Sequence, residues 1–192
     1  MDREQFTNIY WNYYLMLEEK FLNTTRYVEL HLNNFSTFSI EFTNLLLTTC
    51  SEIDVVFKEM LGFDTKEKHT FKQFIQRVKK EHSDIFEIEV KVIDKEIAIN
   101  PFEEKGNATE RWWRSYNNVK HNRKNKFKEA TLENVLYSLG ALFVLEMYQF
   151  KRFYIKHGYG PDIPKRESDL FFIDGWEVRY LTGRSFLYKL ER

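Results

Sequence analysis

The chain has 192 residues, which is enough for one domain with a sizeable core, whereas two domains would both be small. Lysine plus arginine equals aspartate plus glutamate at 29 each, so the net charge is zero and overall charge indicates no partner. The only cysteine, Cys50, excludes an intramolecular disulfide and a cysteine-based metal site. Its apolar helical context favours a buried structural thiol in a reducing compartment.

The sequence predicts no membrane-spanning segment. The first residues lack the basic region and apolar core of a signal peptide. The most apolar run, Val135 to Leu145, is followed by Glu146 and is too short to cross a bilayer. The longer run from Ile40 to Phe63 carries Glu52 and Asp54 near its middle. We therefore expect a cytoplasmic protein without a membrane partner.

Helical spacing dominates the first eighty residues. Aromatic and aliphatic side chains recur every three or four positions over residues 2 to about 32, without proline or glycine. A break and cap within residues 33–36 precedes a second predicted helix, which ends at Gly62. Thr70 is placed to cap a third helix over residues 71–81.

Beyond residue 81 the apolar residues no longer recur every three or four positions but at every second position. The alternating residues surround Asp94-Lys95 and predict a hairpin at about residues 86–100; they are Ile88, Val90, Val92, Ile97 and Ile99. A further helix contains residues 112–123. Thr131 is placed to cap the last one, which runs to about His157 before Gly158 and Gly160-Pro161.

These elements predict an all-α fold, an up-and-down bundle of four to five helices with a small β-hairpin insertion and an irregular C-terminal tail. We expect the bundle to occupy residues 1–160, with the hairpin inserted at about 86–100. Residues 161–192 form a C-terminal extension of short strands or coil.

The segment Trp112–Arg123 is the most informative part of the chain. Arg114 and His121 are seven positions apart, so on a helix they share one face about 10 Å apart along the axis. Asn117 and Asn118 lie on that face too. The opposite face is predicted to pack into the core and carries Trp112, Tyr116 and Val119.

A basic stripe surrounds this segment. It contains no acid and consists of Arg111, Arg114, Lys120, Arg123, Lys124, Lys126 and Lys128. Such a stripe in a neutral protein indicates nucleic-acid binding. The alternative is a solvated helix face, above all for the last three lysines. Trp113 is the aromatic residue that we consider for stacking on a base.

The residue types suit cleavage of RNA, which carries its own 2′-hydroxyl nucleophile. His121 can transfer protons near neutral pH, and Arg114 can hold a phosphate whose charge grows in the transition state. We expect Asn117 and Asn118 to position phosphate or ribose, and Lys120 or Arg123 to hold the flanking backbone. The products are a 2′,3′-cyclic phosphate and a 5′-hydroxyl, and no metal or cofactor is required.

A helical bundle with Arg114-x6-His121 on a late helix resembles the HEPN superfamily, many of whose members are metal-independent RNases. The surrounding residues look similar over 116–123, as do Ser51-Glu52-Ile53-Asp54 and the helix after Thr131. The likeness covers about residues 2–157 without the hairpin. It implies a homodimer whose composite site uses both chains, and a role as a toxin or anti-phage effector. Where active members often have Asn, Asp or His after the arginine, this chain has Ser115.

Other interpretations of these residues remain open. His121 could form a structural hydrogen bond, and Arg114 could pair with Glu52 or Asp54. Such pairing is compatible with catalysis. A carboxylate or the Ser115 hydroxyl can hydrogen-bond to Arg114 or His121 on the side away from the substrate and so fix its orientation. The alternative function is a non-catalytic HEPN-like module that binds RNA or a protein partner, such as an antitoxin or nucleotidyltransferase. The remaining histidines show no metal-ligand spacing.

Overall fold

A computed structural model describes residues 2–64, 69–104, 106, 108–157, 166–175, 177–181 and 184–188. Side chains are described for these residues except 3, 151–157, 177–181 and 184–188. The chain is mostly helical with a small antiparallel sheet, which confirms the predicted fold class. The predicted boundary at residues 160/161, and the predicted helix end at Gly158 and Gly160-Pro161, lie outside the described residues.

The N-terminal helical run is shorter than predicted. It consists of α1 (Arg3–Gln5), a π-helical turn (Phe6–Trp11) and α2 (Asn12–Thr24), and only a 3₁₀ turn (Leu32–Asn34) follows before α3. The predicted extension to residue 32 is therefore wrong. The Thr24 and Thr25 hydroxyls donate hydrogen bonds to the carbonyls of Phe21 (2.6 Å) and Leu22 (2.7 Å). These side chains compete with the backbone for its acceptors, which favours ending the helix here.

The next two helices begin and end at residues suited to that role. In α3 (Ile40–Leu61), the Ser39 hydroxyl accepts from the Phe42 amide, so the cap lies later than predicted, and Gly62 ends the helix at φ +65°. Thr70 and Gln73 form a capping box at the start of α4 (Phe71–Glu81), as the sequence predicts for Thr70. A 3₁₀ turn (Ser83–Glu87) follows.

The predicted hairpin is present and belongs to a larger sheet. Strands β1 (Val90–Val92) and β2 (Ala98–Ile99) pair antiparallel, with Asp94 in the turn at φ 56°. Strand β3 (Phe171–Phe172) pairs with the other edge of β1. The hairpin therefore binds part of the predicted C-terminal extension. Farther on, β4 (Glu177–Leu181) and β5 (Arg184–Tyr188) form a separate antiparallel pair.

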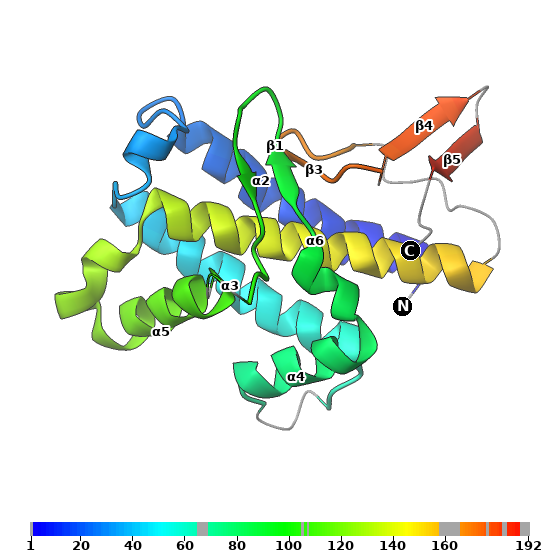
Figure 1. The fold of residues 1–192 in the computed structure, drawn as a ribbon, viewed down its shortest axis with the longest axis horizontal. Helices are drawn as coiled ribbons and strands as arrows, with labels where there is room; N and C mark the ends of the chain where they lie inside the picture. Colours follow the sequence, from blue (N-terminus) through cyan, green and yellow to red (C-terminus); the bar gives the residue numbers. More distant parts are fainter. Residues whose placement is uncertain are drawn as a thin grey trace.

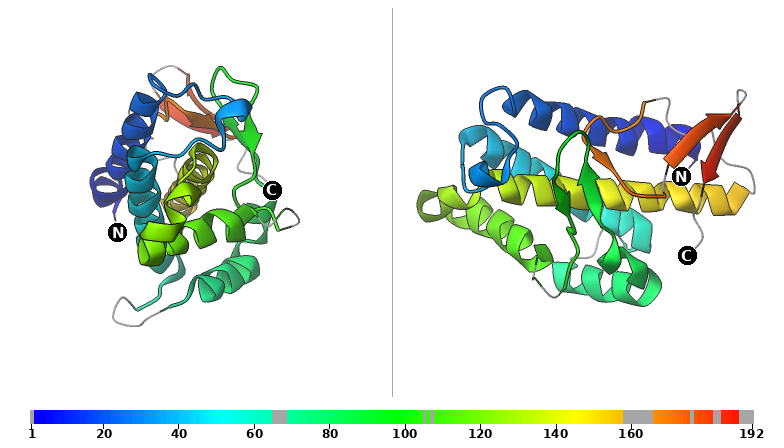
Figure 2. Two further views of the ribbon diagram at one scale, coloured as in Figure 1. Left: turned by 90° about the vertical axis from the view of Figure 1, so that its left-hand side faces the viewer. Right: turned by 45° about the horizontal axis from the view of Figure 1, so that its top comes forward.

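Helix α6 (Leu132–His157) is the centre of the bundle (Figure 1). Its start is capped as predicted, because the Thr131 hydroxyl accepts from the Asn134 amide. Helices α2, α3 and α5 (Ala108–Lys126) and the three-stranded sheet surround it in the end-on view of Figure 2. Its side chains are buried on nearly every side from residue 132 to residue 150, as befits a central helix. Within the described residues, no helix is long and apolar enough to cross a membrane.

The segment from Arg166 to Ile173 is part of the same core. Leu170, Phe171 and Ile173 are buried. The buried Glu18 carboxylate on α2 accepts hydrogen bonds from the Asp169 amide (2.8 Å) and from the Ser168 hydroxyl. This part of the predicted C-terminal extension is thus fixed to the helical bundle by polar as well as apolar contacts.

Candidate functional site

Helix α5 has the two faces that the sequence predicts. Trp112 and Val119 are fully buried and Tyr116 is nearly so. The Trp112 indole donates a hydrogen bond to the Pro101 carbonyl (2.9 Å), which satisfies its polar atom inside the core. Arg114 and His121 are exposed on the other side. The apolar face therefore holds the helix in place and leaves the polar face open to solvent.

The helix bends directly after His121. Asn122 has φ −139° and ψ 46°, which interrupts the helical path, and its side-chain oxygen accepts a hydrogen bond from Asn125. Arg114 and His121 precede the bend, so their spacing of two turns holds. Arg123 follows it, and its direction is therefore not set by the helical repeat that places the other two residues.

Arg114 and His121 are unpaired in the part of the chain that the structure describes. Neither side chain forms a hydrogen bond or an ion pair there. No described contact supports a structural role for His121, and none joins Arg114 to Glu52 or Asp54. Both side chains are available to a ligand.

The other predicted contact residues have partners inside the chain. The Asn117 amide donates to the Trp113 carbonyl (3.0 Å), and the Asn118 amide donates to Glu129 (2.8 Å). Lys120 donates to the Tyr116 hydroxyl (2.9 Å). That hydrogen bond, with help from the charge of Asp54, raises the pKa of Lys120. These three side chains are oriented before any ligand arrives.

Glu129, which the sequence analysis did not select, completes the polar surface. Its two oxygens accept from Asn118 (2.8 Å) and Lys126 (2.8 Å). Burial opposes its ionisation, yet these hydrogen bonds and the charges of Lys126 and Arg114 together lower its pKa. The sequence signal is slight: Glu129 is the first acid after the basic stripe, and only the 3₁₀ turn Phe127–Glu129 brings it back towards α5.

The three residues predicted to orient Arg114 or His121 lie in different surroundings; they are Ser115, Glu52 and Asp54. Ser115 is buried, and its hydroxyl accepts from the Asn134 amide of α6 (3.1 Å). Asp54 pairs with Lys58 of its own helix (2.5 Å). Burial raises the pKa of Glu52, whose charge acts on the buried Glu146. The structure thus places Ser115 in the packing between α5 and α6.

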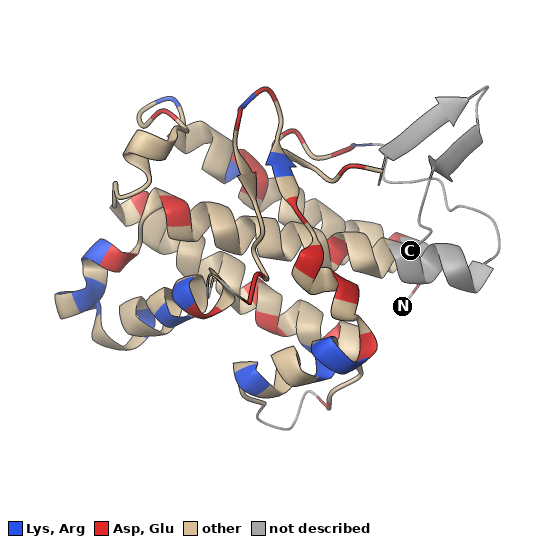
Figure 3. Cartoon of the chain, in the orientation of Figure 1, with Lys and Arg blue, Asp and Glu red and all other residues tan. Residues whose placement is uncertain are grey.

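Four residues of the basic stripe gather at the C-terminal end of α5 and in the turn after it, namely Arg123, Lys124, Lys126 and Lys128 (Figure 3). Phe38 and Phe127 lie there in edge-to-face contact, with ring centroids 5.6 Å apart. The Lys128 ammonium lies 5.9 Å from the centroid of the partly exposed Phe38 ring. Aromatic rings among cations are typical of surfaces that bind single-stranded nucleic acid.

Trp113 lies at the other end of α5. Its ring stacks on Phe71 of α4, with centroids 4.0 Å apart and planes 12° from parallel. One face of the Trp113 ring is therefore occupied within the protein.

Arg111, near the start of α5, also has partners inside the chain. Its guanidinium pairs with Glu133 (3.2 Å) and lies over the Tyr137 ring.

No group of three or more His, Cys, Asp or Glu side chains is placed to hold a metal ion within the described residues. No protein-family model matches the chain, and neither a curated protein nor a solved structure matches it. The function proposed below therefore rests on the geometry of α5 and its neighbours.

Proposed function

We propose that the protein is a metal-independent endoribonuclease of the HEPN type, with a role as a toxin or anti-phage defence effector in the cytoplasm. The observation that supports this proposal is the exposed pair Arg114 and His121 on one face of α5, unpaired in the described part of the chain. An exposed guanidinium and imidazole without internal partners do little for stability, and they suit phosphate binding and proton transfer.

In the proposed reaction, the RNA 2′-hydroxyl attacks the adjacent phosphorus and the bond to the 5′-oxygen breaks. The 2′-hydroxyl proton leaves to a base, and the departing 5′-oxygen receives a proton. His121 serves one of these proton transfers, and Arg114 stabilises the added negative charge on the phosphate. Arg123 and the lysines after the bend hold the flanking backbone electrostatically.

Each chain contributes a single histidine, His121, to the proposed site, so one of the two proton transfers has no histidine within the same chain. A homodimer with its two α5 helices facing each other supplies that group, because the polar face of α5 is exposed and each chain brings one arginine and one histidine. An antitoxin or nucleotidyltransferase partner that covers the same face would block RNA access.

A second candidate function is a non-catalytic module that binds RNA or a protein. The observation that favours it is Ser115, whose hydroxyl is buried against Asn134 and so is not presented beside Arg114. In this case the basic residues bind RNA electrostatically and His121 performs no proton transfer.

Incubation of purified protein with several RNAs in EDTA separates the two candidates. We expect wild-type protein to cleave and to leave 2′,3′-cyclic phosphate ends, identified by mass spectrometry. His121→Ala and Arg114→Ala should each lose about 100-fold or more of the rate. The matched controls, His31→Ala and Arg26→Ala, change exposed residues outside α5 and should cleave normally.

Loss of cleavage in EDTA would contradict the metal-independent mechanism. An intact circular dichroism spectrum without cleavage of any RNA would leave the binding module, which gel-shift titration with the same RNAs then tests. Analytical ultracentrifugation of wild-type protein tests the homodimer.

A further inference from the structure

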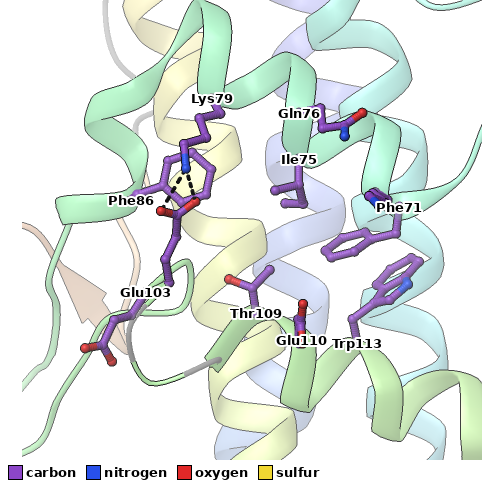
Figure 4. A pocket seen from close by; sticks show the side chains of 11 residues that line it. Phe71, Ile75, Gln76, Lys79, Phe86, Glu103, Thr109, Glu110 and Trp113 are labelled. Carbon is purple, nitrogen blue, oxygen red and sulfur yellow. Dashed lines mark hydrogen bonds and ion pairs between the residues drawn. The ribbon is translucent and has the colours of Figure 1, made fainter.

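A groove of about 640 Å³ lies between α4 and the first turns of α5 (Figure 4). This volume falls within the range of small-molecule sites. Its lining comes from α4, from the 3₁₀ turn after it, from the loop before α5 and from α5 itself. The residues that matter here are Phe71, Ile75, Phe86, Glu110 and Trp113.

One side of the groove is an aromatic wall, formed by the stacked rings of Phe71 and Trp113. Ile75, one turn after Phe71 on α4, adds apolar surface beside the wall, and Phe86 adds it on the far side (Figure 4). Phe71 also meets the buried Trp112 edge-to-face, with centroids 5.6 Å apart, so the wall is supported from the core. A preformed aromatic surface of this kind favours a flat ring as ligand.

The polar lining disfavours an anion in the groove. It carries Lys72 and Lys79 against three glutamates, Glu103, Glu104 and Glu110. Lys79 is engaged, because its ammonium lies 2.7 and 2.9 Å from the two oxygens of Glu104. A phosphate would therefore stay outside the groove, whereas an uncharged ring with hydrogen-bond donors can enter it.

Glu110 is the acceptor that such a ring would meet. Its side chain is exposed and projects from α5 towards α4 (Figure 4). Within the described residues its carboxylate forms no hydrogen bond or ion pair. Hydrogen bonds to a carboxylate in a partly apolar site are stronger than those between neutral groups.

The groove ends close to the proposed catalytic face, because Glu110 lines the groove and Arg114 lies one helical turn farther along α5. Glu110 lies four residues before Arg114, so the two side chains share one face of α5 about 6 Å apart along the axis. His121 lies two turns farther along the same face. A nucleotide with its base in the groove can therefore place its phosphate at Arg114.

We propose that this groove binds one base of the RNA substrate, and that Glu110 selects guanine there. This inference rests on the nuclease function proposed above, and it gives the nuclease site a preference for guanine. Guanine presents two adjacent donors, N1–H and the 2-amino group, which match the two oxygens of one carboxylate. Adenine and cytosine offer an amino group beside an acceptor, and uracil offers one N–H between two carbonyls, so each makes a poorer partner.

The test is binding of the four nucleoside 3′-monophosphates to the full chain, measured by calorimetry and by tryptophan fluorescence. Binding requires no cleavage. We expect guanosine 3′-monophosphate to bind with a dissociation constant of about 1 mM or below, at least about tenfold tighter than the uridine compound. Trp113→Phe should abolish most of the fluorescence change and keep the binding.

Glu110→Gln should remove most of the guanine preference, because a neutral amide offers one acceptor oxygen and adds donors. Phe71→Ala should weaken all four nucleotides together. The control Glu41→Gln changes an exposed glutamate at the start of α3 and should bind like wild type. Absence of saturable binding, or an unchanged base preference in folded Glu110→Gln, would overturn the proposal.

The outcomes separate this proposal from the nuclease function. Cleavage in EDTA without nucleotide binding, and with a cut pattern unchanged by Glu110→Gln, removes the guanine site and leaves the nuclease. Guanine-selective binding without cleavage of any RNA removes the nuclease and leaves a base-binding groove.

Discussion

Asn118 and Glu129 connect α5 to the 3₁₀ turn that precedes α6 through a hydrogen bond of 2.8 Å. Lys126 donates to the second oxygen of the same carboxylate over 2.8 Å. One partly buried acid thus ties residues on both sides of the bend at Asn122. It also sets a negative charge close to Arg114, in the middle of an otherwise basic surface.

Glu129→Ala should lower the free energy of unfolding by about 1–2 kcal/mol, because two hydrogen bonds to a charged acceptor are lost. It should also tighten RNA binding several-fold, since the negative charge beside Arg114 disappears. Urea denaturation and fluorescence anisotropy measure the two effects. Equal unfolding midpoints for the variant and wild type would mean that the link carries no stability.

This contribution depends on pH in a defined direction. The pKa of Glu129 is lowered on folding, so its stabilisation is present above the unfolded pKa and is lost as pH falls through the folded value. The stability difference between wild type and Glu129→Ala should therefore shrink below about pH 4.

Ser115 should matter for stability more than for chemistry. Ser115→Ala removes one acceptor of the buried Asn134 amide, which keeps the Glu129 carbonyl at 2.9 Å, so a loss of about 1 kcal/mol is expected. Ser115→Asn should cost more, because a larger side chain does not fit a buried position. Thermal unfolding measures both variants. A folded Ser115→Ala protein that no longer cleaves RNA would show that the hydroxyl acts in the reaction.

Glu146 should make the protein less stable as pH rises. It is fully buried on α6, and neither carboxyl oxygen has a hydrogen-bond partner in the described part of the chain. Burial, and then the charge of Glu52, raise its pKa well above the ordinary value. A carboxyl whose pKa rises on folding favours the folded state at low pH, and this preference is lost as pH rises through the folded pKa.

Glu146→Gln removes that titration while nearly keeping the shape. Its unfolding free energy should therefore fall less than that of wild type between about pH 5 and pH 9, measured by urea denaturation at several pH values. Glu19→Gln, at an exposed position of α2, serves as the control and should follow wild type. Parallel pH curves for wild type and Glu146→Gln would contradict the argument.

Glu18→Ala should release the segment that carries β3. The carboxylate accepts from the buried Tyr14 hydroxyl (2.5 Å) and, in a partly buried setting, from the Asp169 amide and the Ser168 hydroxyl. Removing it leaves the Asp169 amide without this acceptor and the Tyr14 and Ser168 hydroxyls with only their mutual hydrogen bond (3.1 Å), which should cost about 3 kcal/mol. Limited proteolysis should then cut near Ser168 before the helices, whereas simultaneous cutting throughout the chain would indicate global unfolding instead.

The features that the sequence predicts correctly depend on nearby residues. The two faces of α5 follow from the spacing of Trp112, Tyr116 and Val119, and the Thr70 cap follows from its position before α4. The hairpin at β1 and β2 follows from alternation around Asp94-Lys95. Arg114 and His121 are exposed together for the same reason, since helical geometry alone places them.

What the sequence misses depends on distant contacts. Glu18 meets Ser168 across 150 positions, and no local pattern indicates that pairing. Phe71 reaches Trp113 from another helix, so the groove has no sequence signature. Glu129 returns to Asn118 through a 3₁₀ turn that no periodicity predicts. The apolar repeat does not predict the helix end at Thr24, where the threonine hydroxyl competes for a backbone acceptor.

Because β1 pairs with β3, one edge of β1 has no partner until β3 has been synthesised. Val92 leaves the ribosome long before Phe171, its partner in the sheet. At about 5–20 residues per second, the outer edge of β1 stays open for about 4 to 16 s, and Glu18 lacks its C-terminal donors for longer. An open strand edge is a template for pairing with other chains. The speed of translation between Val92 and Phe171 therefore determines how long a nascent chain can misassemble through β1.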